Sequence, residues 1–81
     1  MPKVDGIPGP YSFYFFSADC DEPRHVHVRR EKRRCKIWLD PVWLAWNRGF
    51  STRELNLIWS YIAEHEPKIR ETWNAHCGWR L

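Results

Sequence analysis

Two stretches of alternating residues joined by a charged turn constrain the fold of this chain more than any other feature. Apolar and polar residues alternate over residues 25–29 and again over residues 34–39, which is the pattern of half-buried strands. A tight turn at residues 31–32, or a four-residue loop around it, pairs Val28 with Cys35 in an antiparallel hairpin. A shift of one residue would turn charged side chains into the core, so this register is favoured.

Aromatic segments on both sides of the hairpin predict two further strands. Residues 11–17 are mostly aromatic and are bounded by turn formers. Residues 42–47 follow a break at Asp40-Pro41 and can return antiparallel to the second strand of the hairpin. If that register continues without interruption, Trp46 lies opposite Cys35 on the inner face of the sheet.

Two short helices are expected after the sheet. Ser51-Thr52-Arg53-Glu54 has the form of a capping box and predicts a helix start. Pro67 suits the first turn of a second helix, which Gly78 would end. His65 and His76 continue the buried faces of these helices, so we expect structural roles for both. The predicted fold class is α+β, with an antiparallel sheet of about four strands and two C-terminal helices packed on one face.

Length and composition predict one small domain. The chain has 81 residues, and its six Trp, four Phe and three Tyr can substitute for a larger core. Residues 1–10 form an extended lead-in, and residues 11–81 form the domain. Cys20, Cys35 and Cys77 lack metal-type spacing, and no secretion signal or long apolar run is present. We therefore expect a soluble cytoplasmic protein with reduced thiols.

A histidine pair followed by a basic run is the strongest chemical signal in the chain. His25 and His27 would share the outer face of their strand, about 7 Å apart. Between Arg24 and Lys36, seven basic residues stand against one acidic residue, Glu31, which predicts a patch for an anionic partner. The nucleic-acid or partner-binding surface is predicted to comprise Arg24, Arg29, Arg30, Lys32, Arg33, Arg34, Lys36, Trp38 and Trp43.

The histidine pair allows two kinds of chemistry and one reading without chemistry. As base and acid, His25 and His27 would be the catalytic residues of a metal-independent ribonuclease, with nearby cations stabilising the developing charge. A metal site would need a third ligand, for which Cys20, Asp19 and Asp21 are candidates. The surrounding cations would repel a dication, so no metal and no cofactor are expected. The pair could also stand idle on an exposed strand.

Binding without catalysis is a further hypothesis. Basic side chains supply phosphate contacts, and exposed Trp38 and Trp43 could stack on unpaired bases of RNA or another nucleic acid. An acidic protein could instead cover the indoles or add a strand to the sheet edge. A homodimer suits so small a core, and no membrane partner is expected.

Two segments, Pro23-Arg24-His25-Val26-His27-Val28 and Ser51-Thr52-Arg53-Glu54-Leu55, are followed by Trp59, Ile62, His65 and Trp73. This strand motif and helical tail resemble a prokaryotic family, domain of unknown function 4160 (DUF4160), over roughly residues 11–77. Val26 and Val28 depart from the aromatic and small residues usual in the family. The resemblance implies one half of a two-gene toxin–antitoxin pair, beside a partner resembling domain of unknown function 2442 (DUF2442). We therefore expect a toxin-like module that binds or cleaves RNA, or else a non-enzymatic interaction module or inhibitor.

Overall fold

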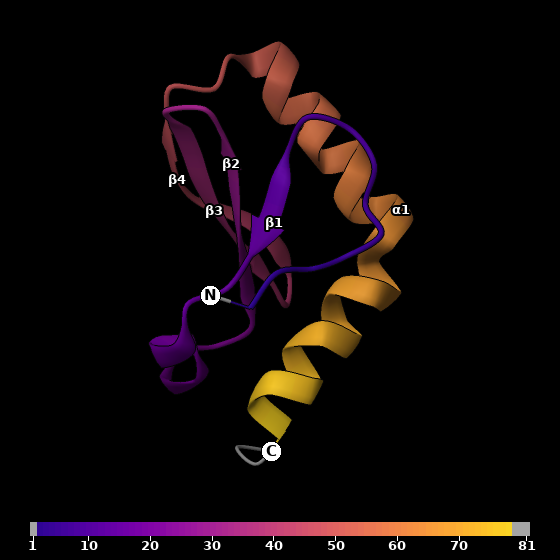
Figure 1. Ribbon diagram of the computed structural model, residues 1–81. Helices are drawn as coiled ribbons and strands as arrows, with labels where there is room; N and C mark the ends of the chain where they lie inside the picture. Colours follow the sequence, from indigo (N-terminus) through magenta and orange to yellow (C-terminus); the bar gives the residue numbers. More distant parts are fainter. Residues whose placement is uncertain (1, 79–81) are drawn as a thin grey trace.

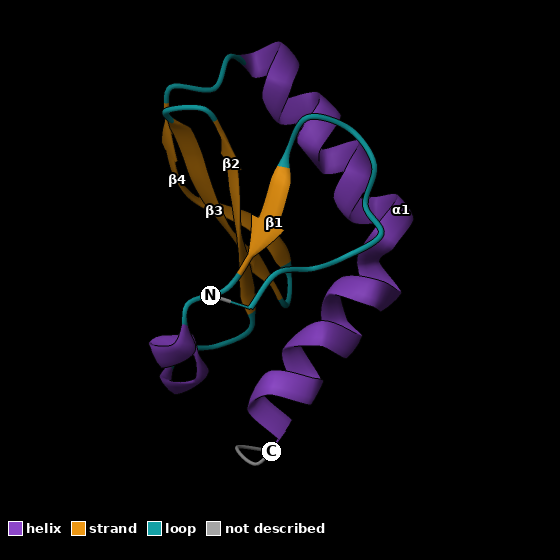
Figure 2. Ribbon diagram, in the orientation of Figure 1, coloured by secondary structure: helices purple, strands orange, loops and turns teal. Residues whose placement is uncertain are grey.

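The structure is a computed structural model that describes residues 2–78, and it consists of a four-stranded antiparallel sheet and one long helix (Figure 1). The helix runs along one face of the sheet, and its C-terminal half extends past the strands toward a short 3-10 helix (Figure 2). The predicted α+β class is therefore confirmed. In chain order the elements are β1 (Ser12–Tyr14), η1 (Ser17–Asp21), β2 (His25–Arg30), β3 (Arg33–Leu39), β4 (Val42–Arg48) and α1 (Thr52–Cys77), with the sheet order β1-β2-β3-β4.

The predicted register of the central hairpin is confirmed. Val28 pairs with Cys35, and the pairing continues to Arg30 opposite Arg33, so a two-residue turn joins β2 to β3. Glu31 in that turn adopts a positive φ of 56°. A non-glycine residue is rarely found in this left-handed region, and the turn lacks the Gly or Asn typical of such positions. Side-chain burial on both faces of the sheet therefore determines the register rather than turn chemistry.

The register between β3 and β4 is interrupted, which corrects one prediction. Trp38 pairs with Trp43 as the alternation requires, but the register shifts between Lys36 and Ile37. Trp46 consequently lies opposite Lys36, on the outer face, and not opposite Cys35. Such a β-bulge inserts one extra residue into one strand and reverses the facing of every later side chain.

One helix replaces the two that were predicted. Ser51 caps α1 by accepting a hydrogen bond from the Glu54 amide at 3.1 Å, so the predicted start is confirmed. The chain bends at His65, whose φ of −111° and ψ of 16° are not helical, and the helix resumes through Pro67. Proline lacks an amide hydrogen and its ring crowds the preceding turn, which explains a kink here. The buried side chains on both sides of the kink are Ile58, Ile62, Ile69, Trp73 and Cys77.

A disulfide joins η1 to the end of α1, which corrects the prediction of reduced thiols. Cys20 and Cys77 are bonded with their Cα atoms 5.4 Å apart and 57 residues apart in the chain. Spacing along the sequence could not reveal this disulfide, because only the folded arrangement of η1 and α1 brings the two cysteines together. Cys35 is a free buried cysteine, and burial raises the pKa of its thiol to about 12. Disulfides persist mainly in oxidising compartments, and the cytoplasmic location stays a prediction.

Part of the N-terminal lead-in lies along the β1 edge of the sheet. Residues 2–4 run along β1, where the Val4 amide donates to the Phe13 carbonyl and the Phe15 amide donates to the Pro2 carbonyl, both at 2.8 Å. The β1 edge is therefore partly covered.

Within residues 2–78, no helix is both long and apolar enough to cross a membrane.

An ion-pair cluster ties the β3–β4 turn to the second half of α1. Asp40 accepts hydrogen bonds from Arg70 at 2.7 Å and from Arg24 at 2.9 Å. Partial burial acts to raise the pKa of Asp40, but these two guanidinium groups outweigh it and hold the pKa below its ordinary value of 3.8. Stabilisation by Asp40 is therefore present above that value and is lost as the pH falls through the lower folded pKa.

The Asp40→Asn variant is expected to be less stable than the wild type at neutral pH, because it loses the charge that pairs with Arg24 and Arg70. The loss should not exceed about 1 kcal/mol, since solvent screens these half-exposed pairs. The difference should disappear in strong acid, where wild-type Asp40 is itself neutral. Urea unfolding midpoints at about pH 7, 4 and 2 measure this. An undiminished difference at the lowest pH would contradict the proposed role of the charge.

Candidate functional site

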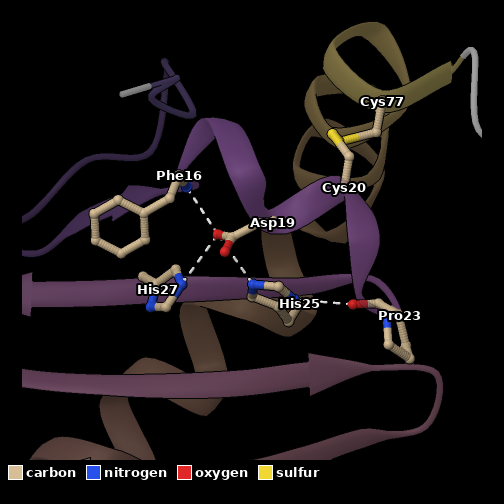
Figure 3. Close-up of a disulfide and its surroundings, with 7 residues drawn as sticks. All are labelled: Phe16, Asp19, Cys20, Pro23, His25, His27 and Cys77. Carbon is tan, nitrogen blue, oxygen red and sulfur yellow. Dashed lines mark hydrogen bonds and ion pairs between the residues drawn. A yellow bond between two sulfur atoms is a disulfide. The ribbon is translucent and has the colours of Figure 1, made fainter.

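A buried cluster of one aspartate and two histidines lies where η1 crosses the outer face of β2 (Figure 3). Asp19 Oδ2 lies 3.0 Å from His25 Nε2 and 3.1 Å from His27 Nε2. The same oxygen accepts a hydrogen bond from the Phe16 amide at 2.7 Å. Alternation along β2 places both imidazoles on one face, as predicted, and η1 brings the carboxylate to them.

Burial of this cluster corrects the predicted exposure of the histidines. The exposed fractions of His25, His27 and Asp19 are 0%, 6% and 7%. The Phe16 ring contacts His27 with centroids 4.8 Å apart, and η1 lies over the same face. The Trp73 ring reaches His25 from α1 at 5.1 Å. The outer face of β2 is thus covered at this end, and the histidines are not part of an open platform.

The electrostatics of the cluster follow from its hydrogen bonds. Burial acts to raise the pKa of Asp19, but the Phe16 amide and the two imidazoles outweigh it and lower the pKa. Burial lowers the pKa of His27, and the nearby His25 lowers it further. The charge of Asp19 acts to raise this pKa but does not outweigh them. Asp19 is therefore an anion at neutral pH and His27 favours its neutral form.

A row of arginines crosses the outer face at the opposite end of the strands. Arg29 pairs with Arg34 across β2 and β3, and Arg34 pairs with Arg48 across β3 and β4. All three side chains are exposed. We call Arg29, Arg34 and Arg48 the arginine row. Arg48 was absent from the predicted site, because only the bulge in β4 brings it to the outer face opposite Arg34.

Several of the predicted binding residues already have acidic partners. Arg33 Nη1 donates to Glu54 Oε1 at 2.7 Å, and Arg30 lies 3.7 Å from the same carboxylate. Lys36 pairs with Glu22. Within the described range, Arg29, Lys32 and Arg34 have no ion pair with an acidic side chain. Of the predicted cations, these hairpin residues are the ones available to an external anion.

The two predicted stacking residues differ in their accessibility. Trp43 is 68% exposed, whereas Trp38 is only partly exposed beneath the Lys36 ammonium, which lies 4.4 Å from its ring centroid. Trp46 is 37% exposed and carries the Arg48 guanidinium 5.3 Å above its ring. Trp46 was predicted to face inward, so the bulge adds an indole beside the arginine row.

These features define a small α+β domain with a buried Asp-His-His cluster at one end of its sheet and exposed arginines at the other. The chain belongs to the family described as Domain of unknown function (DUF4160), whose model matches residues 11–74. The predicted resemblance is therefore confirmed. No curated protein and no solved structure matches the chain.

Proposed function

We propose that this protein binds single-stranded RNA through the outer face of β2, β3 and β4 at the hairpin end. The arginine row is the observation that carries the proposal. Like charges directly opposite one another on a sheet destabilise it, so three adjacent arginines carry an energetic cost that a phosphate backbone would relieve. Arg29, Glu31, Lys32 and Arg34 line a shallow pocket of about 400 Å³ beside the row.

Exposed indoles next to the arginines favour an unpaired nucleic acid. Trp46 lies two residues before Arg48 on β4, and its half-exposed ring has the Arg48 guanidinium over it. Aromatic side chains beside a basic strip bind single strands by stacking, with about 1–3 kcal/mol for each stacked base. RNA bases in loops and single strands are accessible for such stacking, whereas paired bases are not.

Binding is better supported than cleavage by the histidines. A general base must come within hydrogen-bond reach of the proton that it removes. His25 has no exposed surface, and η1 lies between both rings and solvent. A scissile phosphate could reach them only after η1 had moved, and the Cys20–Cys77 disulfide tethers η1 to α1.

The Arg34→Gln variant is expected to bind a single-stranded RNA oligonucleotide about 5–10-fold more weakly than the wild type. Loss of one phosphate contact should also reduce the slope of log affinity against log salt by about 0.7. Fluorescence anisotropy over a series of salt concentrations measures both quantities. The variant should be at least as stable as the wild type, because its removal of a like charge relieves repulsion.

Lys68→Gln is the matched control, since it removes one exposed charge from the second half of α1, away from the hairpin. It should leave RNA affinity unchanged. An Arg29→Gln/Arg34→Gln variant that binds RNA as tightly as the wild type would overturn the proposal. A toxin-like role in a two-gene pair is part of the proposal, and it requires that expression slows growth and that the double variant relieves the effect.

A protein partner is the second candidate, and the open edge of the sheet favours it. β4 pairs only with β3 among the described strands, and Val42 and Trp43 are exposed along it. An acidic partner such as a DUF2442-like protein, or a second copy of the chain, could add a strand there. Size-exclusion mass with and without the neighbouring gene product distinguishes a monomer, a homodimer and a hetero-complex.

A further inference from the structure

The Asp19, His25 and His27 cluster is not used by RNA binding, and its donor atoms converge on one point. One carboxylate oxygen and one ring nitrogen from each histidine all lie within 4.8 Å of one another. Three protein ligands of this type are the number found in zinc sites that keep one open position. The cluster therefore has the composition and spacing of a metal site.

Hydrogen bonding at the far side of the His25 ring determines what its other nitrogen can do. Nδ1 lies 2.9 Å from the Pro23 carbonyl oxygen, which can only accept, so Nδ1 carries a hydrogen. In the neutral ring Nε2 then has a lone pair and no hydrogen. The nearest carboxylate oxygen, Asp19 Oδ2, is 3.0 Å away and also offers only lone pairs. A cation bound by both atoms at once would resolve the conflict.

His25 Nε2 has no other means of satisfaction. It is fully buried and has no partner with hydrogen-bond geometry in the described part of the chain. A buried polar atom without a partner costs about 1–3 kcal/mol, so such atoms are rare in folded proteins. Nε2 of His65 and of His76 is likewise buried without a partner in residues 2–78, but of the three only His25 belongs to the Asp19 cluster. The orphaned nitrogen of His25 is thus an observation separate from the spacing, and it points to a cation as its partner.

The outer partners of the cluster are those that orient metal ligands. Histidines that bind metals usually donate their second ring hydrogen to a backbone carbonyl or carboxylate, as His25 does to Pro23. The ligating carboxylate is itself usually hydrogen-bonded, as Asp19 is by the Phe16 amide. These contacts hold the donor atoms in place without a metal.

We infer that Asp19, His25 and His27 form a binding site for a divalent transition metal, with Zn²⁺ as the best fit. Imidazole and carboxylate ligands together suit Zn²⁺ and Fe²⁺ and are poorly suited to Ca²⁺ or Mg²⁺. Ligand bonds of about 2.0–2.1 Å in a tetrahedral site separate neighbouring donor atoms by about 3.3 Å. The nitrogen-to-oxygen distances of 3.0 and 3.1 Å are close to that separation.

The basic run, from which the sequence predicted that no metal would bind, is a weaker obstacle in the structure. Lys36, the cation opposite His27, is paired with Glu22. Arg24 is paired with Asp40. The arginine row is exposed to solvent at the other end of the strands, where water and salt screen its charge. The local field at the cluster is therefore dominated by the Asp19 carboxylate.

A proton is the alternative to the metal. If His25 were an imidazolium, it would donate to Asp19 and form a buried ion pair without any metal. The two states differ in a measurable way, because the metal site binds Zn²⁺ in one equivalent through both histidines. The proton-bridged cluster would not.

Isothermal titration of ZnCl₂ into the tag-free, oxidised, EDTA-treated chain tests the inference. We expect one equivalent to bind, the His27→Gln variant to lose at least 10-fold in affinity, and Zn²⁺ to raise the melting temperature of the wild type but not that of His27→Gln. His76→Gln is the matched control and should bind like the wild type. Its ring lies beside the Cys20–Cys77 pair, the other group of potential ligands among residues 2–78.

Two results would overturn the inference. One is a wild type that shows no binding of ZnCl₂ and no thermal shift. The other is affinity lost in His76→Gln and kept in His27→Gln, which would place the metal at His76 and not at the Asp19 cluster. If circular dichroism shows that His27→Gln is unfolded, Asp19→Asn takes its place with the same expected loss, because the amide keeps the shape of the carboxylate and removes its charge.

Discussion

Replacement of both Cys20 and Cys77 by serine is expected to lower the free energy of unfolding by about 4 kcal/mol. The disulfide links residues 57 apart, and closing a loop of that length reduces the entropy of the unfolded chain by an amount worth about 4 kcal/mol. Small domains have a net stability of only about 5–15 kcal/mol, so the loss is a large fraction of the total. Urea unfolding followed by tryptophan fluorescence measures it.

A reducing agent provides the control for this prediction. Dithiothreitol should lower the unfolding midpoint of the wild type toward that of the double-serine variant, and it should leave the variant unchanged. Cys35→Ala should respond to the reductant as the wild type does, since Cys35 is unpaired in the core. Identical wild-type midpoints with and without reductant would show that the pair contributes nothing to stability.

Local alternation was sufficient to predict most of the sheet. Val26 and Val28 face the core because any other register would bury charge, and the same argument fixes the pairing of Trp38 with Trp43. The argument fails for residues 34–36 of β3, because nothing in the alternation of residues 42–48 marks the position of a bulge in their partner strand. Trp46 was therefore assigned to the wrong face of the sheet, and Arg48 was left out of the predicted site.

The histidine site was predictable only in part. Period-two spacing shows that His25 and His27 share a face, but it cannot show what covers that face. The cover comes from η1, which a contact between Cys20 and Cys77 ties to the far end of α1. The acidic residues before the motif were the one local signal for Asp19, and the sequence offered Asp21 and Cys20 as equal candidates. Of these three residues, the long-range packing of η1 on the sheet places Asp19 against the two histidines.

Trp73→Ala is expected to destabilise the domain by about 3–5 kcal/mol, the range for removing a buried aromatic side chain. Trp73 is 4% exposed, and its ring packs edge-on against Phe15 with centroids 5.2 Å apart and against His25 at 5.1 Å. It is thus the contact through which the second half of α1 covers the histidine cluster. Loss of the indole would leave a cavity beside His25 and open the cluster to water.

The same substitution at Trp43 is the matched control, because that indole is 68% exposed and truncation there leaves no cavity. Trp43→Ala should change the free energy of unfolding by no more than about 0.5 kcal/mol. Chemical unfolding followed by far-UV circular dichroism avoids the change in fluorescence that loss of a tryptophan causes. Equal effects of the two substitutions would contradict the packing of α1 described above, since burial of Trp73 alone predicts the difference between them.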